Sequence, residues 1–367
     1  MLAQPEVQNI HCRSSFTDNV VFSSSAGYLD FISGLLFVFL AFVLTAFMVL
    51  IQDIWTDIVE IIGKIENANE NIVLLVIIAV MSPFLVQRTL HALRFNCYVG
   101  FASVSILCLA LCHHALTAPL PKPLLLWTTS MSDALFAFPI IILSFLSIFN
   151  ILPIQGGLID PSRPRIKGII SGAVGSSFIL MWLFGVAGYL YAGVNTKGNI
   201  LLNCDHHLDW MFFLGRLGCG LTLMLAMAMV LLPCRSSLLE VVDMLTNHPH
   251  IVVTEEELPL IKAKEAVMKR PSLGEDPVVH YTSTLGIVVV CYFAAVRVPG
   301  VAFVWSLCGS FMAFFIAFIL PAACYIKLQR RNPTPDNKVW IRFSWVLLVV
   351  SVICAIACSI QTMSQLF

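Results

Sequence analysis

The sequence has little charge. Of its 367 residues, 11% are Asp, Glu, Lys or Arg and 59% are hydrophobic. A soluble domain carries about 25% charged residues, so this chain has too little polar surface to cover a water-soluble globule of its size. Acidic and basic residues balance at 21 each, which leaves no net positive charge to attract nucleic acid. The composition indicates an integral membrane protein embedded in a lipid bilayer, with no nucleic-acid partner.

Motifs for catalysis and cofactor binding are also missing. The 12 cysteines form no CxxC pair, which argues against a zinc ribbon or a disulfide scaffold. The sequence contains no glycine-rich phosphate loop, no HExxH and no GxSxG. We therefore expect no enzyme activity, no cofactor and no metal site. One segment leaves an alternative open: residues 204–207 read Cys-Asp-His-His, which fits either a solvated loop or a zinc or pH-sensing site.

Long apolar stretches dominate what is present. A membrane-spanning helix needs about 20 mostly apolar residues. Nine stretches meet this requirement, at 28–52, 72–92, 95–117, 134–154, 168–193, 210–233, 281–298, 300–327 and 339–363. Residues 1–27 are polar and lack the pattern of a signal peptide. The one long connection, 234–280, contains Thr254 and Glu257 at the spacing of a capping box, which predicts a short surface helix.

The basic residues predict the orientation of these spans. Of the 21 lysines and arginines, 16 fall on the N-terminal segment and alternate loops, and 5 fall on the opposite loops. Loops rich in Lys and Arg stay in the cytoplasm. The bias therefore places residues 1–27 and loop 234–280 in the cytoplasm, and the C-terminus outside the cell or in a lumen. Asp133, Arg216 and Arg297 lie near span ends, and we expect them to reach the membrane interface.

The stretch 134–154 has the features of an interrupted helix. Pro139 lies inside it, Ser144, Ser147 and Asn150 follow, and Pro153 comes near its end. A proline inside a helix removes one backbone hydrogen bond. In a bilayer the freed carbonyl is tolerated only where it faces protein or a water-filled cavity. The pattern predicts a broken helix beside a binding site; a kinked helix without a ligand is the alternative.

Four segments carry a resemblance to a known family. Residues 145–167 contain Ile151-Leu152-Pro153-Ile154 and then Asp160-Pro161, and the stretches 168–193, 216–236 and 299–328 follow in matching order. This pattern resembles the amino acid/auxin permease family, which includes the sodium-coupled neutral and the vacuolar amino acid transporters. The resemblance covers about residues 28–366.

The resemblance implies a fold. Members of that family have eleven helices in a five-plus-five inverted repeat, the LeuT-like transporter architecture. With 134–154 taken as helix six, the nine predicted spans correspond to helices three to eleven. We therefore expect an all-α membrane protein with one transporter domain over 28–366, apparently without the family's first two helices.

The resemblance also implies site residues. Aligned with the family motif, Ser144, Phe145, Ser147 and Asn150 would line the amino acid site, with Pro139 and Pro153 marking the helix break. The alternative is that Ser147 bonds back to a helix carbonyl. The family's sodium-ligating hydroxyls fall by register on Met224 and Ala226, which cannot ligate an ion. Thr222 is the only nearby hydroxyl and a weak ion ligand, so the register favours coupling to H+, or no coupling, over Na+.

The expected function is secondary transport of amino acids, of the neutral class, by alternating access. The competing hypothesis is a non-transporting homologue: an amino acid sensor, a regulatory partner or a truncated gene product. A plasma membrane and a vacuolar or lysosomal membrane fit the sequence equally, and the sequence leaves the oligomeric state open.

Overall fold

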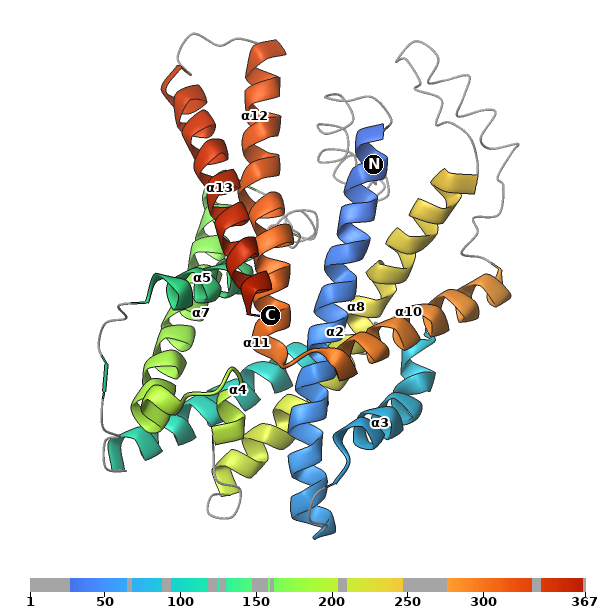
Figure 1. Ribbon diagram of the computed structural model, residues 1–367, viewed down its shortest axis with the longest axis vertical. Coiled ribbons are helices and arrows are strands. Elements are labelled where there is room, and N and C mark those ends of the chain that lie inside the picture. Colours follow the sequence, from blue (N-terminus) through green and yellow to red (C-terminus); the bar gives the residue numbers. More distant parts are fainter. Residues whose placement is uncertain are drawn as a thin grey trace, which may run out of the picture.

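The computed structural model describes most of the chain. The described residues are 27–64, 68–87, 94–117, 124–125, 130–146, 158, 162–203, 210–246, 276–331 and 338–365. Within them every regular element is helical (Figure 1). The elements are α2 (Gly27–Gly63), α3 (Glu70–Leu85), α4 (Arg94–Thr117), α5 (Met131–Ser144), α7 (Arg163–Ala192), η2 (Gly193–Asn195), η3 (Ile200–Asn203), α8 (Trp210–Thr246), α10 (Pro277–Arg297), α11 (Val301–Cys308), η6 (Gly309–Ala313), η7 (Phe315–Ile319), α12 (Leu320–Arg331) and α13 (Lys338–Ser364).

These helices correspond to the predicted spans. Seven helical segments, with α11 to α12 taken as one, are long and apolar enough to cross a membrane. The other two, α3 and α5, have 16 and 14 residues. They coincide with the described parts of the predicted spans 72–92 and 134–154. An all-helical architecture suits a bilayer because a helix satisfies its backbone hydrogen bonds internally.

Helix α2 forms the centre of the fold (Figure 1). It packs against α8 along its length and also contacts α3, α10 and α11. Leu44, Met48 and Ile51 on α2 are fully buried, as is Met227 on α8. Tight burial of large aliphatic side chains gives van der Waals packing, which is the main attraction between helices when lipid is as apolar as the core.

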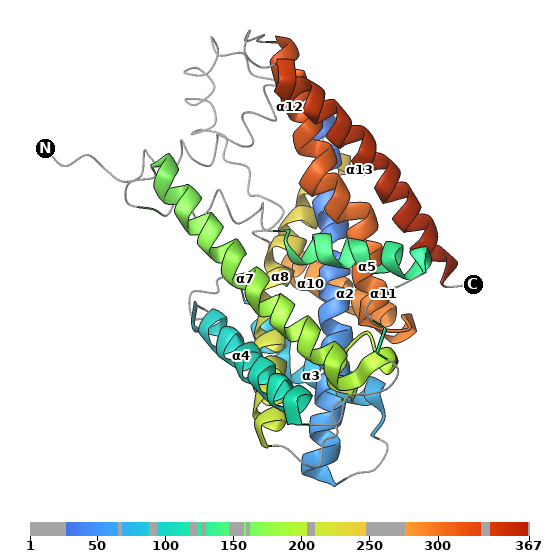
Figure 2. The ribbon, with the colours of Figure 1, turned by 90° about the vertical axis from the view of Figure 1, so that its left-hand side faces the viewer.

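A second layer is built from α4 and α7. Helix α4 packs against α8, and α7 packs against α4 (Figure 2). The α4–α8 contact is close because α8 carries glycines there: a Cβ on Gly215 would overlap Leu107, and one on Gly218 would overlap Ser103. Small residues at such positions let two membrane helices approach each other.

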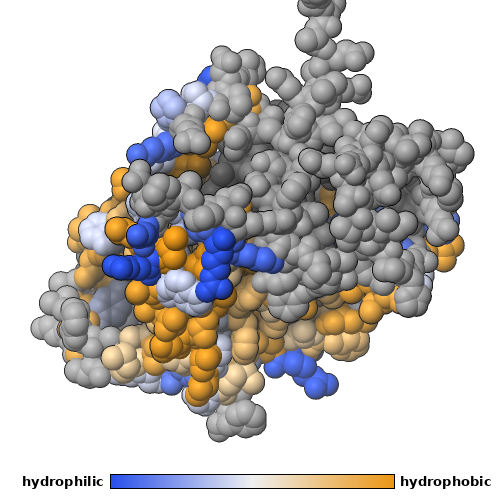
Figure 3. Space-filling model, turned by 90° about the horizontal axis from the view of Figure 1, so that it is seen from above, coloured by the Kyte–Doolittle hydropathy of each residue, from blue (hydrophilic) through white to orange (hydrophobic). Residues whose placement is uncertain are grey.

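The outer surface of the described residues is apolar. Large exposed hydrophobic side chains include Leu75 and Val80 on α3, Trp182 on α7 and Ile353 on α13. Figure 3 shows broad hydrophobic areas interrupted by small hydrophilic patches. A soluble protein rarely exposes apolar patches of this extent, and contact with lipid accounts for them.

Two predicted helix ends were wrong. Helix α2 does not stop at residue 52 but continues to Gly63, because Asp53, Asp57 and Glu60 are spaced to lie on one face. Helix α8 does not stop at Pro233 but continues to Thr246. Pro233 removes one hydrogen bond, and the buried Arg235 beyond it anchors the next turn. Loop 234–280 is correspondingly shorter, and its predicted surface helix lies outside the described residues.

Candidate functional site

Helix α5 meets α11 at Pro139, which lies inside the helix; α5 continues past this proline to Ser144. Pro139 is buried against Gly309, and a Cβ on Gly309 would overlap the Pro139 carbonyl. Gly309 is also the first residue of η6, one of two π-helical turns between α11 and α12. Single π-helical turns inside α-helices occur frequently at functional sites. The structure thus brings a proline-containing helix and a π-helical segment into backbone contact, which we call the α5–α11 junction.

Hydroxyl groups satisfy the backbone at this junction. Ser306 Oγ lies 3.0 Å from the Phe136 carbonyl oxygen and 2.7 Å from Thr362 Oγ1. Thr362 Oγ1 also lies 2.9 Å from the Cys358 carbonyl. Both hydroxyl side chains are completely buried. The two hydroxyls hydrogen-bond to each other and to the carbonyls of Phe136 and Cys358, and so connect α5, α11 and α13.

Replacing Ser306 by alanine should destabilise this junction. The Phe136 carbonyl and Thr362 would each lose one hydrogen bond, and a hydrogen bond contributes about 0.5–1.5 kcal/mol to stability. We expect a lower Tm in detergent for Ser306→Ala, measured by differential scanning fluorimetry. Ser283→Ala is the control, because Ser283 Oγ donates only to the His280 carbonyl on its own helix α10. Equal Tm values for the two variants would contradict the role given to Ser306.

Two of the predicted substrate-lining residues lie at the end of α5. Ser144 is exposed, and its Oγ donates to the Ile141 carbonyl at 2.7 Å. Phe145 follows the last residue of α5 and faces α7, with its ring centroid 6.4 Å from that of Phe178. Ser147, Asn150 and Pro153 lie outside the described residues. The role of all these residues in substrate binding therefore stays a prediction.

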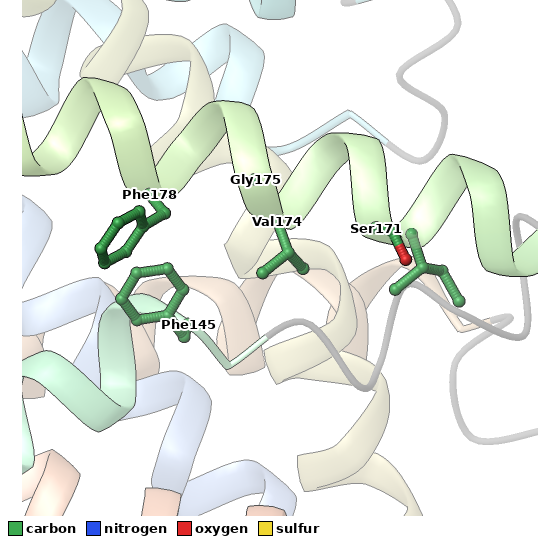
Figure 4. A pocket seen from close by; sticks show the side chains of 6 residues that line it. Phe145, Ser171, Val174, Gly175 and Phe178 are labelled. Atoms are coloured by element: carbon green, nitrogen blue, oxygen red, sulfur yellow. The ribbon is translucent and has the colours of Figure 1, made fainter.

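Phe145 borders a groove between α5 and α7. The groove has a volume of about 490 Å³, and its lining is mostly apolar. Figure 4 shows Phe145 and Phe178 facing each other across it, with Ser171 and Gly175 on the same side of α7. The groove opens beside the C-terminal end of α5, and this end of a helix carries a partial negative charge.

Thr222, the predicted weak ion ligand, lies between α8 and α4. Its Oγ1 donates to the Gly218 carbonyl at 2.8 Å, and its carbonyl accepts from Asn96 Nδ2 at 3.3 Å. Its methyl group faces Gly100. Thr222 therefore uses its hydroxyl proton within its own helix.

A polar cluster that the sequence reasoning missed lies at the C-terminal end of α2. Arg216 on α8 is 2% exposed, and its Nη1 donates to Asp57 Oδ2 at 3.0 Å. Its Nη2 donates to the Leu201 carbonyl in η3. The expectation that Arg216 reaches the interface is thus wrong, because Asp57 neutralises it inside the protein. Asp133 and Arg297 are exposed, and their position at the membrane interface stays a prediction.

Two more contacts extend this cluster. Asn199, which precedes η3, donates through Nδ2 to Asp53 Oδ2 at 3.0 Å. Gln52 donates through Nε2 to Glu70 Oε2 on α3 at 3.1 Å. The sequence did contain a signal for the cluster, since acidic residues recur on one face of an otherwise apolar helix.

A buried cation lies towards the opposite end of α8. Arg235 Nη1 donates to Thr284 Oγ1 at 3.1 Å and lies 3.3 Å from His280 Nε2. The same Nε2 is 2.8 Å from the Val86 carbonyl. All three side chains are at most 6% exposed. These contacts join α8 and α10 to the end of α3.

The long apolar helices, their lipid-facing surface and the polar groups enclosed between them define an integral, multi-pass membrane protein. Comparison with known sequences narrows the class. The sequence model of one family, described as "Transmembrane amino acid transporter protein", matches residues 2–364, so the chain belongs to this family.

Individual relatives are distant. The chain is 25% identical over 283 residues to vacuolar amino acid transporter 5 of Saccharomyces cerevisiae, covering 72% of this chain and 61% of the relative. It is 26% identical over 237 residues to amino acid transporter AVT6C of Arabidopsis thaliana, covering 62% and 48%. Vacuolar amino acid transporter 6 of S. cerevisiae is 24% identical over 340 residues, covering 83% and 75%. The matches to the first two thus span 61% and 48% of their lengths. No solved structure gives a significant match.

Proposed function

We propose that this chain carries out secondary transport of neutral amino acids by alternating access. The α5–α11 junction is the observation that carries the proposal, together with membership of the family. There a helix containing Pro139 meets a π-helical stretch that begins at Gly309. In a bilayer, helix irregularities such as an internal proline are tolerated where they line a cavity or pack on protein, and transporters place irregular helices at their solute sites.

The proposed substrate position is the end of α5. The C-terminal end of a helix favours a positive charge, so it suits the ammonium group of an amino acid. The apolar wall formed by Phe145, Val174 and Phe178 suits an uncharged side chain. In this proposal Ser144, Ser147 and Asn150 supply the polar contacts.

We further propose coupling to H+ rather than Na+. Sodium prefers several oxygen ligands. Thr222 offers a single side-chain oxygen, and its neighbours Met224 and Ala226 have none. The relatives named vacuolar transporters favour a vacuolar or lysosomal membrane for this chain, with the plasma membrane as the alternative.

Uptake into proteoliposomes tests the proposal. The full chain, reconstituted with an imposed pH gradient, should take up labelled neutral amino acids above the level of empty vesicles. Uptake should saturate, should be reduced by unlabelled competitors, and should disappear when a protonophore dissipates the gradient. Replacing external Na+ by choline should leave it unchanged.

Two outcomes would contradict this proposal. Uptake that needs Na+ would contradict the coupling ion while keeping the transport function. Binding of an amino acid by the reconstituted protein without uptake above empty vesicles would favour the non-transporting homologue.

A further inference from the structure

The residues that follow α7, up to Asn203, contact the C-terminal part of α2. We call residues 193–203, which comprise η2, η3 and the turn between them, the cap. The cap is packed on the described helices: a Cβ on Gly198 would overlap Ala302 of α11, and Leu201 is buried. The charge pattern of the loops predicts that this end of the protein faces outside or into a lumen.

Two carboxylates of α2 hold the cap. Asp53 accepts from Asn199 of the cap at 3.0 Å. Asp57 accepts from Arg216 at 3.0 Å, and Arg216 also donates to the Leu201 carbonyl of the cap. Thus Asp53 holds the cap directly, and Asp57 holds it through Arg216. Within the described residues these are contacts between parts of the chain that lie 146 and 159 positions apart.

Negative charge exceeds positive charge around these contacts. Helix α2 contributes Asp53, Asp57 and Glu60, and α3 contributes Glu70; the facing cations are Lys197 of the cap and Arg216 of α8. Among the described residues, four carboxylates therefore face two cations. The contacts from Asn199 and Arg216 favour the charged carboxylates, so adding a proton to Asp53 or Asp57 weakens these two contacts. A metal ion would have to approach the guanidinium of Arg216.

Buried polar atoms on the same part of α2 lack partners. Gln52 is 9% exposed, and its Oε1 accepts no hydrogen bond from the described residues, although its Nε2 binds Glu70. Thr56 is 7% exposed, and its Oγ1 has no partner among the described residues. These polar atoms lie on the same two turns of α2 as Asp53 and Asp57.

We propose that Asp53 and Asp57 form a proton-binding site that controls the cap, so that protonation from the outer or lumenal side releases residues 193–203 from α2. This inference rests on the proposed function, for which it supplies a coupling site and a gate. The carboxylate charge strengthens the hydrogen bonds from Asn199 and Arg216. When the proton adds to a carboxylate oxygen, that contribution is lost and the cap is held more weakly.

Hydrogen–deuterium exchange of the full chain in nanodiscs tests the inference without requiring transport. After correction for intrinsic exchange, amides of the cap should exchange roughly tenfold faster at about pH 5 than at about pH 7.5. Asp53→Asn and Asp57→Asn together should give fast exchange at both pH values. Asp133→Asn, which changes an exposed carboxylate on α5, is the control and should behave as the wild type.

Asn199→Asp gives the most specific test, because it should reverse the pH dependence of cap exchange through the contact with Asp53. Two facing carboxylates repel each other near neutral pH, whereas in acid one takes a proton and donates it to the other. The side-chain oxygen of residue 199 can still accept from the Leu201 amide, which keeps the local turn. Cap exchange in this variant should therefore be slower at about pH 5 than at about pH 7.5.

The inference and the proposed function can fail separately. Equal cap exchange at both pH values in the wild type would overturn the proton-binding site, even if the proteoliposomes take up amino acids. The same holds if Asn199→Asp keeps the wild-type direction. Conversely, a pH-dependent cap in a protein that shows no uptake would support the site and contradict the transport function.

Discussion

Replacing Asp57 by alanine should cost about 3 kcal/mol or more of stability, the largest single-residue effect that we expect in this protein. The reason is that Arg216, which is 2% exposed, would keep its charge while losing the carboxylate 3.0 Å away. Removing one partner of a buried pair leaves an uncompensated charge, which is worse than removing both. The Tm of purified Asp57→Ala in detergent, and its yield as a monodisperse species, measure the effect.

A double-mutant cycle separates the ion pair from general damage. Asp57→Leu combined with Arg216→Met removes both charges and keeps apolar volume, so its stability should lie well above that of either single variant. If the double variant is as unstable as the sum of the two single variants, the two residues do not interact and the assignment of the pair is wrong.

Replacing Gly309 by alanine should separate α5 from α11 and abolish uptake. The added Cβ would overlap the backbone carbonyl of Pro139, which cannot move aside as a flexible side chain can. Overpacking at such a contact costs about 1–3 kcal/mol. It also displaces the helix end that carries Phe145, so transport should fall more than stability does. The measurement is initial uptake per reconstituted protein alongside the Tm of the same preparation.

The control for this variant is another helical glycine. A Cβ on Gly286 of α10 would meet no atom within 4 Å, so Gly286→Ala should keep uptake. It should also raise stability by up to about 1 kcal/mol, because alanine favours helix more than glycine does. Opposite effects at Gly309 and Gly286 would support the α5–α11 junction, whereas normal uptake in Gly309→Ala would contradict its role.

Hydropathy was sufficient to predict the helical segments, and the motif around Ile151-Leu152-Pro153 was sufficient to predict the family. Both depend on local properties of the chain: a span needs a run of apolar residues, and a motif is contiguous. The helix end predicted at residue 52 was wrong because the acidic residues beyond it resemble a loop in a hydropathy profile. A profile averages over all faces of a helix, so it cannot show that Asp53 and Asp57 lie on a single face.

Contacts between distant residues could not be predicted in the same way. Arg216 has an apolar surrounding in the sequence, and its partner Asp57 is 159 positions away. The hydroxyl that contacts the α5 backbone comes from Ser306, which in turn contacts Thr362, and no local pattern connects either residue to α5. The π-helical turns after Cys308 also have no local signature here, because they depend on packing against α5 and α13.

Because α7 leads into the cap, a small movement of the cap would displace the far end of this helix. Helix α7 has 30 residues and leads directly into the cap at Gly193. Among the described elements it packs mainly against α4, and it leans away from the central helices (Figure 2). At 1.5 Å per residue it is a rod of about 45 Å, so a tilt of about 10° at the cap would displace its far end by about 8 Å. A small movement of the cap beside Asp53 would then become a much larger displacement at the other end of α7.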